Sequence, residues 1–378
     1  MSIFLTLAYG YVRQLAKRGI KFLLFAVGRK ILNNKIQKIL FFDQFTSFEE
    51  LLKSHKRSRR AKRYKYSVID FENNLFDNLS KLELELKNGT YKVGKYKTFY
   101  IYEPKKREIQ SLGYRDRIIQ HSVCDNFLVP YYDKKLVYCN CACRIGKGTY
   151  FARQLLKRYY VEFFKKYGKN GYVLKCDIKK YFANIDHKIL KNKLNEIKDK
   201  KCVNLLFSII DSYNKDIEKG LPIGNQVSQI LGVVYMDKID RLIKEILRVK
   251  FYVRYMDDLI LLSSNKNELK LCLHKIIEEL KTLKLELNQK TNISRLKNGL
   301  EFLGAKYEIQ DTGKIVLKIK EQTKRKFNNK LKVVKFYNSK KLIEQNYIKS
   351  QIGGEKGHLK GFNANKMFCG HRTALLSI

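Results

Sequence analysis

Apolar residues along this chain recur at two spacings, and the spacing predicts which segments are strands and which are helices. Residues 172–177 and 251–262 are short runs rich in aromatic, valine, isoleucine and leucine side chains, which predicts strands. Apolar residues three and four positions apart predict amphipathic helices over residues 46–87, 118–129, 150–164, 227–246 and 265–283. Between residues 172 and 308 the order is strand, helix, hairpin, helix, strand, the split βαβ layout of an α+β fold, with residues 301–305 closing the unit.

The most informative stretch is residues 251–262, in which two apolar runs flank the adjacent carboxylates Asp257 and Asp258. No Gly or Pro lies between the runs, so we expect a tight β-hairpin with both acids at its tip. Two neighbouring negative charges are unfavourable, and a divalent cation such as Mg2+, which prefers carboxylate oxygens, would offset them. Asp is also a common turn residue, so the hairpin alone fits an ordinary turn equally well.

A third acid favours the metal interpretation. Asp177 ends another short strand, and apolar residues at helical spacing follow it. Acids at the ends of neighbouring strands can hold two Mg2+ ions, one activating an attacking hydroxyl and the other neutralising a leaving group in phosphoryl transfer. The sequence therefore predicts a catalytic metal centre at Asp177, Asp257 and Asp258, with Ile178 beside the first acid included in the metal site.

Composition points to a nucleic-acid partner. The chain has 378 residues, 44% of them hydrophobic, so it can bury a core of two or three subdomains. Its 78 Lys and Arg against 36 Asp and Glu give a formal net charge of +42, interleaved with 25 Tyr and 22 Phe. Basic residues neutralise phosphates and aromatic rings stack on unpaired bases. The alternative is a generally basic protein from a Lys-rich proteome.

Cysteines and the N-terminal segment bear on the cellular compartment. The eight cysteines include Cys139, Cys141 and Cys143 but no second pair at zinc-site spacing, so we expect reduced thiols in a cytoplasmic protein. Residues 1–42 contain no acid, and basic residues interrupt every apolar run, so no membrane span is predicted. This extension could lie on a membrane, act as a targeting peptide, or form an extra helical layer on nucleic acid or on the next domain.

Further residues are candidates for nucleotide binding. Lys105, Lys106 and Arg107 lie at the tip of a second predicted hairpin and could grip a triphosphate, although such charge runs are often solvated turns. Phe182 could exclude a ribose 2′-hydroxyl or belong to the core. Lys290 could protonate a departing pyrophosphate or be an ordinary surface lysine.

The loop at residues 220–229 opens the helix predicted over 227–246. Gly224 in this loop would let backbone approach a ligand closely. A second glycine-bearing stretch, residues 143–150, is too short and wrongly spaced for a nucleotide-binding P-loop, which argues against an ATPase.

In combination, these blocks resemble a reverse transcriptase of the prokaryotic type, from about residue 45 to the C-terminus. Tyr255-Met256-Asp257-Asp258 resembles the catalytic box of that family, and Asp177 with Phe182 resembles its first palm motif. The resemblance implies that Arg107, with Lys105 or Lys106 nearby, contacts the incoming triphosphate and that Lys290 is the palm lysine. It also implies that Tyr255 and Met256 lie at the primer and template, and that Phe302-Leu303-Gly304 is the primer grip.

The same resemblance implies a right-hand polymerase fold with fingers, a ferredoxin-like βαββαβ palm and a helical thumb. The implied boundaries are a basic extension at 1–42, fingers at 43–170, a palm at 171–308 with a fingers insertion near 190–220, and a thumb at 309–378. The implied partners are an RNA template, a DNA or RNA primer and dNTPs, with two Mg2+ ions for which Mn2+ can substitute. An accessory protein or a structured RNA would complete the system, since the thumb leaves no room for an RNase H or integrase domain.

One departure suggests a subfamily. Most reverse transcriptases carry Gln-Gly and then Ser-Pro before the long helix, whereas this chain has Ile223-Gly224 and Ser228-Gln229. That form resembles the reverse transcriptases of diversity-generating retroelements, as do Cys143-Arg144, the glycines after them, and Gly357-His358. In that group the lost Gln is linked to error-prone copying, because an aliphatic side chain cannot hydrogen-bond the nucleotide. We assign Ile223, Gly224 and Gln229 to nucleotide binding.

Four alternatives stay open at the level of sequence. Similar loops occur in defence-associated reverse transcriptases, and a group II intron-like or retron-type enzyme is a further reading. An RNA-dependent RNA polymerase usually carries a second Asp where this chain has Phe182. A catalytically silent RNA-binding scaffold would have no reason to keep three mutually repelling acids.

Overall fold

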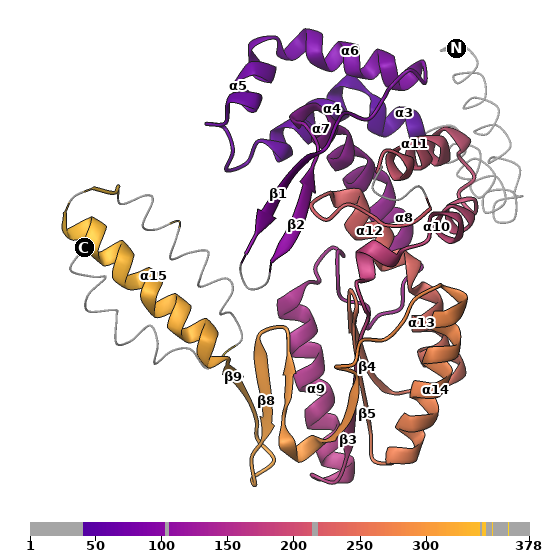
Figure 1. Ribbon diagram of the computed structural model, residues 1–378, viewed down its shortest axis with the longest axis vertical. Coiled ribbons are helices and arrows are strands. Elements are labelled where there is room, and N and C mark those ends of the chain that lie inside the picture. The colour runs from indigo at the N-terminus through magenta and orange to yellow at the C-terminus, as the bar shows by residue number, and fades with distance from the viewer. Residues whose placement is uncertain are drawn as a thin grey trace, which may run out of the picture. The chain divides into compact units, whose positions relative to one another are not determined.

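The computed structural model describes residues 41–102, 106–213, 218–340, 342–344, 350 and 362. The chain forms two compact units, named unit 1 and unit 2 here. Of the described residues, unit 1 joins those up to Lys97 with Leu112–Phe127 and Lys191–Ser212, and unit 2 joins those in Thr98–Ser111 and Leu128–Leu190 with those from Tyr213 onward. Element labels follow Figure 1. The N-terminal extension as far as residue 40, Lys105, and Gly357-His358 lie outside the described residues.

Unit 1 is helical in its described part, as the apolar spacing over residues 46–87 predicts. Its helices are α3 (Phe41–Thr46), α4 (Phe48–Ser58), α5 (Tyr66–Asn73), α6 (Leu75–Lys87), α7 (Tyr114–Val123) and α11 (Lys200–Asp211). The side chain of Ser47 accepts a hydrogen bond from the Glu50 amide and so caps α4. Asp199 caps α11 in the same way and also accepts from the amide of Phe42 at 3.1 Å, which ties α11 to α3.

Unit 2 is built around a four-stranded antiparallel sheet. Its strands are β3 (Tyr172–Asp177), β4 (Phe251–Tyr255), β5 (Asp258–Ser263) and β6 (Asn292–Arg295), in the order β4-β5-β3-β6. This order is that of a ferredoxin-like βαββαβ unit, so the predicted α+β class is confirmed. The closing strand is β6, and the prediction that residues 301–305 close the unit is wrong. Those residues belong to a separate sheet.

Helices cover both faces of this sheet. The helices that lie within unit 2 include α8 (Val129–Asp133), α9 (Thr149–Tyr167), α12 (Gln226–Tyr235), α13 (Asp237–Arg241), α14 (Lys266–Thr282) and α15 (Glu321–Ser339). On one face of β4, Phe251 contacts Tyr159 of α9 at a ring separation of 5.7 Å. On the other face, Tyr252 donates a hydrogen bond to Asp240 of α13, and Figure 1 shows α9 and α13 on opposite sides of the strands. Residues on both faces of β4 are therefore buried.

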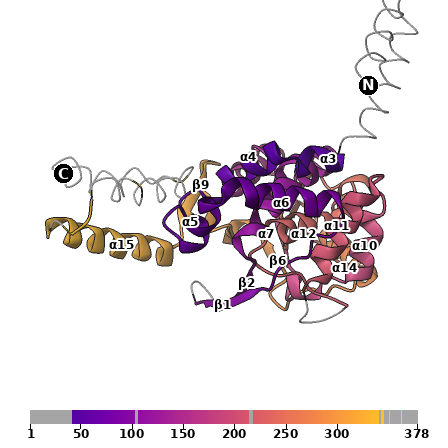
Figure 2. The ribbon, with the colours of Figure 1, turned by 90° about the horizontal axis from the view of Figure 1, so that it is seen from above.

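Two smaller sheets complete unit 2. One is the hairpin of β1 (Lys97–Ile101) and β2 (Arg107–Ser111), and the other joins β7 (Leu300–Phe302), β8 (Ala305–Ile309) and β9 (Ile315–Ile319). Figure 2 shows β1 and β2 side by side in this hairpin. The stretch after residue 308 is predicted to be mostly helical, and in its described part the strand β9 precedes the 19-residue helix α15. None of the helices in the described part of the chain is both long and apolar enough to cross a membrane.

Two predicted helices are interrupted. After Asp177 the chain turns at Lys180, which has a φ of +45°, and makes the short 3-10 turn Tyr181–Asn184 before α10 (His187–Leu194) begins. The long helix predicted over 227–246 is divided into α12, α13 and the π-helical turn Leu242–Ile246. Apolar spacing misses such breaks because the successive pieces keep one face toward the same core.

Candidate active site

Strand register brings the three acids to one end of the sheet. The pairing of β3 with β5 sets Asp177 directly opposite Asp258. The pairing of β4 with β5 sets Tyr255 opposite Asp258, so Met256 and Asp257 form the two-residue turn between these strands. All three carboxylates are half-buried. Residues far apart in the chain therefore meet at the tip of the predicted hairpin.

The turn that carries Asp257 has an unusual backbone. Met256 has a φ of +55°, in the left-handed region that residues other than Gly seldom adopt. Arg254, fully buried on β4, donates from Nη1 to the Met256 carbonyl at 3.0 Å. The same guanidinium donates from Nε and Nη2 to the two oxygens of Asp240, at 2.8 and 2.7 Å. A buried ion pair therefore holds the carbonyl that precedes the first acid of the hairpin.

The electrostatic surroundings of Asp257 oppose its ionisation. Burial raises the pKa of Asp257 above its ordinary value, and the charge of Asp177 adds to that effect. The positive charges of Arg107 and Arg254 act in the opposite direction. Carboxylates that repel one another in a half-buried place are suited to a cation, which would remove the cost of their charge.

The segment after α14 holds the third acid in place. The amide of Asn288 donates to the Asp177 carbonyl at 2.7 Å, and the Asp177 amide donates to the hydroxyl of Thr291 at 3.3 Å. Lys290 lies between these two residues and its side chain is exposed. Ile178 forms an isolated bridge with Leu287 in the same segment. The predicted catalytic lysine is thus carried by a turn bonded directly to the backbone of Asp177.

The donor set suits a hard divalent cation, but the side chains are not gathered into a finished site. Within the described ranges, no three or more His, Cys, Asp or Glu side chains are grouped closely enough to hold a metal ion. The opposed register of Asp177 and Asp258 nevertheless supplies carboxylate oxygens at one sheet end.

The β1–β2 hairpin contributes cations to the same unit. Arg107 is exposed at the start of β2, and its charge acts on Asp257. Lys106 is also exposed, and its ammonium lies 5.0 Å from the ring centre of Tyr100. The hairpin therefore places positive charge near the acids.

The loop before α12 packs on this hairpin. The amide of Gln110 on β2 donates to the Ile223 carbonyl at 2.9 Å. Gly224 has a φ of +122°, and a Cβ there would lie 2.9 Å from Cγ2 of Ile109 and 3.1 Å from the Gln110 carbonyl oxygen. The backbone at Gly224 therefore approaches β2 closely. Gln229 is exposed at the first turn of α12, 3.8 Å from the sulfur of Cys143.

Phe182 is half-buried in the short 3-10 turn after Asp177. A Cβ added to Gly232 of α12 would lie 3.2 Å from its ring, and the neighbouring Tyr181 hydroxyl donates to the Gly232 carbonyl. The absence of a side chain at Gly232 thus makes room for the Phe182 ring. The apolar residues at helical spacing after Asp177 are thus divided between this 3-10 turn, which carries Phe182, and α10.

The predicted primer grip is a tight hairpin. Phe302 pairs with Ala305 across the turn Leu303-Gly304, whose φ angles are +47° and +77°. Two positive φ angles match a type I′ turn. Phe302 is buried, while Leu303 and Gly304 reach the surface.

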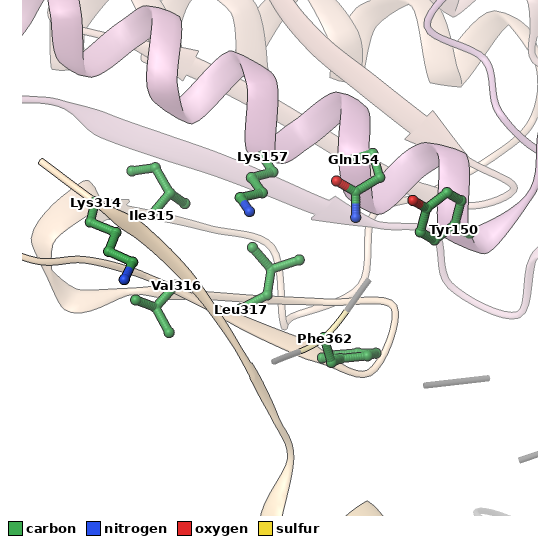
Figure 3. A pocket seen from close by; sticks show the side chains of 8 residues that line it. All are labelled: Tyr150, Gln154, Lys157, Lys314, Ile315, Val316, Leu317 and Phe362. Atoms are coloured by element: carbon green, nitrogen blue, oxygen red, sulfur yellow. The ribbon is translucent and has the colours of Figure 1, made fainter. Parts of the chain in front are cut away.

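A pocket of about 370 Å³ lies elsewhere in unit 2, between α9 and the β9 strand. Figure 3 shows Tyr150, Gln154 and Lys157 of α9 facing Lys314 and Leu317. None of the predicted site residues lines this pocket. We therefore place the candidate active site at the acids.

Several supporting residues are absent from the sequence-based prediction. Arg254 and Asp240 were not identified, although a charged residue inside an otherwise apolar strand is a signal of a buried partner. Asn288 and Thr291 were not identified either, because hydrogen bonds to a backbone 114 positions away leave no local pattern.

Comparison with known proteins adds three observations. A "Putative COX1/OXI3 intron 2 protein" of Saccharomyces cerevisiae is 37% identical over 79 residues, which is 19% of this chain and 9% of that protein. Telomerase from Candida albicans, solved in complex with a TWJ fragment of telomeric RNA, matches 61% of this chain and 46% of its own at 14% identity and a TM-score of 0.48. Apo telomerase from Candida tropicalis matches 60% of this chain and 49% of its own at 15% identity and a TM-score of 0.45.

The family assignment rests on a match that includes all three acids. The model of the family described as "Reverse transcriptase (RNA-dependent DNA polymerase)" matches residues 105–307, more than half of the 378 residues. The chain therefore belongs to the reverse transcriptase family.

Proposed function

We propose that this protein is an RNA-directed DNA polymerase that adds dNTPs to a primer 3′-hydroxyl on an RNA template. The observation that carries the proposal is the register that sets Asp177 opposite Asp258, with Asp257 in the adjoining turn, in a chain of this family. Strand ends that present three carboxylates suit phosphoryl transfer, which depends on positioning and charge neutralisation. The primer is DNA or RNA.

The side chains have distinct roles in this proposal. Asp177, Asp257 and Asp258, with the Ile178 carbonyl, would hold two Mg2+ ions, or Mn2+ in their place. When bound, such ions activate the attacking hydroxyl and neutralise the leaving phosphate. The turn of Asn288 and Thr291 fixes the backbone of Asp177.

Other residues act on the nucleotide and the primer. Arg107 neutralises the triphosphate, assisted by Lys105 or Lys106, and Lys290 donates a proton to pyrophosphate. Phe182 excludes the ribose 2′-hydroxyl, which requires the ring to stay against Gly232. Tyr255 and Met256 position the primer end with the Phe302-Leu303-Gly304 turn.

We also propose fingers at 43–170, a palm at 171–308 and a thumb at 309–378. The grouping of Lys191–Ser212 with the N-terminal helices supports an insertion of the fingers near 190–220.

We further propose that copying is error-prone, as in a diversity-generating retroelement. Ile223 is 38% exposed, and its carbonyl is occupied by Gln110. Its side chain offers a nucleotide no hydrogen bond. An Ile223→Gln change is expected to lower the misincorporation frequency, as read by sequencing the cDNA. An unchanged frequency would remove this assignment.

The experiment for the main proposal is primer extension. The protein is given poly(rA), oligo(dT) and either dTTP or UTP, with Mg2+. We expect extension with dTTP but not UTP, and a loss of at least a thousandfold in Asp177→Asn and Asp258→Asn, because charge neutralisation supplies several kcal/mol of the barrier reduction. Phe182→Ala should admit UTP, whereas Phe182→Tyr should not. Extension by the acid variants at the wild-type rate would refute the proposal.

A further inference from the structure

The connection between α4 and α5 in unit 1, residues 59–66, is an ordered stretch, which we name the α4–α5 loop. The amides of Arg60, Lys62 and Lys65 each donate to the carbonyl three residues earlier, at 3.2, 2.9 and 3.0 Å. Ala61 adopts a left-handed φ of +56° between these turns. Successive hydrogen-bonded turns thus hold the side chains of the loop on a defined backbone.

The arginines at the base of the loop already have acidic partners. Arg57 at the end of α4 pairs with Asp125 at 2.9 Å, and Arg59 pairs with Glu72 at 2.6 Å. Ser58 between them is buried. Arg57 and Arg59 therefore stabilise the fold through ion pairs. These pairs attach the start of the loop to the segment after α7 and to α5, respectively.

The cations beyond this base are different. Arg60, Lys62, Arg63 and Lys65 form no ion pair with any acid in the described part of the chain. The sequence has no Asp or Glu between Glu50 and Asp70. The fold therefore leaves this group of charges without internal neutralisation.

The charged groups around Lys62 are also positive, with no acid among those that shift its pKa. Burial lowers the pKa of Lys62, and the charges of Arg117 and Lys65 lower it further, with no acid acting in the other direction. In Lys284, by contrast, the hydrogen bond to Asp186 raises the pKa. Gathered positive charge of this kind attracts a polyanion.

Two tyrosines stand among these cations. Tyr64 is 77% exposed and Tyr66 is 80% exposed, the highest values among the large apolar side chains of the described residues. Each ring therefore has open faces. Ring faces stack on unpaired bases, and adjacent Lys and Arg side chains neutralise the phosphates that join them.

We propose that the α4–α5 loop is a binding surface for an unpaired nucleic-acid strand. Arg60, Arg63 and Lys65 contact phosphates, and Tyr64 and Tyr66 stack on successive bases. Base-paired RNA hides its base faces, so it fits the tyrosines poorly. The surface belongs to unit 1, whereas the acids belong to unit 2, and the inference does not depend on the catalytic role of those acids.

The first test compares two triple variants of equal charge loss. One is Arg60→Gln, Arg63→Gln and Lys65→Gln, and the control on α14 is Lys266→Gln, Lys270→Gln and Lys281→Gln, three lysines whose side chains are exposed. Binding to unstructured 12-nucleotide RNA and DNA strands is measured against salt concentration in EDTA. The loop variant should lower the slope of log affinity against log salt by about 2, because each phosphate contact contributes about 0.7. The α14 variant should leave the slope unchanged.

The second test separates stacking from charge. Tyr64→Phe keeps the ring and should bind like wild type, whereas Tyr64→Leu should lose affinity on the order of tenfold. A 12-nucleotide RNA containing 4-thiouridine should cross-link to the peptide that holds Tyr64 and Tyr66. RNA cross-linking more strongly than DNA identifies an RNA strand as the occupant, and the reverse identifies DNA.

Three results would overturn the proposal. The first is an equal change in salt slope for the two triple variants. The second is equal affinity in the Phe and Leu variants at residue 64. The third is a loop variant that loses binding only to duplex RNA or to vesicles of phosphatidylcholine and phosphatidylglycerol, which would make the loop a surface for a duplex or a membrane.

Discussion

Arg254 donates hydrogen bonds both to Asp240 and to the turn that carries Asp257. Each of these two groups would destabilise the fold without such a partner. One is a buried carboxylate, Asp240, and the other is a left-handed Met256. The guanidinium also donates from Nη2 to the Val233 carbonyl at 2.8 Å, so it bonds to three separate segments. Replacing Arg254 removes the positively charged partner of Asp240 and the support of the turn together.

We expect Arg254→Met to destabilise the protein by about 3–5 kcal/mol, the usual effect of leaving one member of a buried ion pair behind. The double variant Arg254→Met, Asp240→Asn should recover much of that stability, because no buried charge is left unpaired. It should still extend primers slowly, because nothing then holds the Met256 carbonyl. Urea unfolding and single-nucleotide incorporation over a range of Mg2+ concentrations measure the two effects.

The double variant Arg254→Met, Asp240→Asn separates a positioning role of Arg254 from a purely structural one. If it folds and incorporates nucleotides at the wild-type rate, Arg254 is only a structural residue. A raised Mg2+ requirement with normal folding is the result that a positioning role predicts. Arg254→Lys should lie between the extremes, since one ammonium cannot replace the full set of guanidinium bonds.

The contact between the β1–β2 hairpin and the loop before α12 shows how one element fixes another. Gly224 has no room for a side chain and lies against Ile109 and Gln110 of β2. This contact helps set where Arg107, three residues before Gln110, stands relative to the acids. The hairpin is therefore not positioned by its own two strands alone.

Gly224→Ala should destabilise the protein by about 1–3 kcal/mol and raise the KM for dNTPs, because a positive φ is strained for Ala and β2 must move. Gly148→Ala is a matched control, since its φ is +134° and a Cβ there would meet nothing within 4 Å. The control should lose stability through strain but keep its KM. Thermal unfolding and steady-state kinetics test this pair, and equal KM changes would contradict the positioning of the hairpin by Gly224.

Helix α4 of unit 1 contains a buried histidine that makes stability depend on pH. His55 lies 2.9 Å from the Tyr114 hydroxyl and 3.2 Å from Glu72. Burial lowers the pKa of His55 below its ordinary value of 6.5. The unfolded chain therefore takes up a proton near pH 6.5 that the folded chain resists, so stability is present above that pH and falls as the pH drops through it.

A His55→Gln variant should show less of this pH dependence. One proton contributes at most about 1.4 kcal/mol for each pH unit below 6.5. Urea midpoints measured from pH 8 to pH 5 should therefore fall more steeply in the wild type than in the variant. Parallel curves would show that His55 is protonated equally in both states.

Local pattern was sufficient to predict the acids but not their supports. Strands that end at Asp177 and begin at Asp258 follow from apolar runs, and antiparallel pairing then brings the acids together. The strand β6 (Asn292–Arg295) has four residues and is mostly polar. It therefore lacks the alternation of apolar and polar residues that predicts a strand. The hydrogen bond from the Gln110 amide to the Ile223 carbonyl joins segments far apart in the chain, so no local pattern predicts the contact of Gly224 with β2.

At the scale of the whole molecule, the family assignment and the sheet order agree. The match over residues 105–307 includes β3, β4, β5 and β6, whose order is that of a ferredoxin-like unit. Unit 1 carries the exposed cations and tyrosines of the α4–α5 loop. Under the two proposals made above, the acids of unit 2 and the α4–α5 loop of unit 1 would each bind nucleic acid.

The central claim is that acids far apart in the chain share bound divalent ions. The most direct measurement replaces Mg2+ with Fe2+ on the protein bound to primer and template, then adds ascorbate and peroxide, so that radicals cut the backbone beside the metal. We predict cuts near Asp177 and near Asp257 together, suppressed by excess Mg2+ and lost at both places in Asp177→Asn. Cutting at only one of the two segments, or cutting near Asp257 that persists in Asp177→Asn, would contradict a shared metal centre.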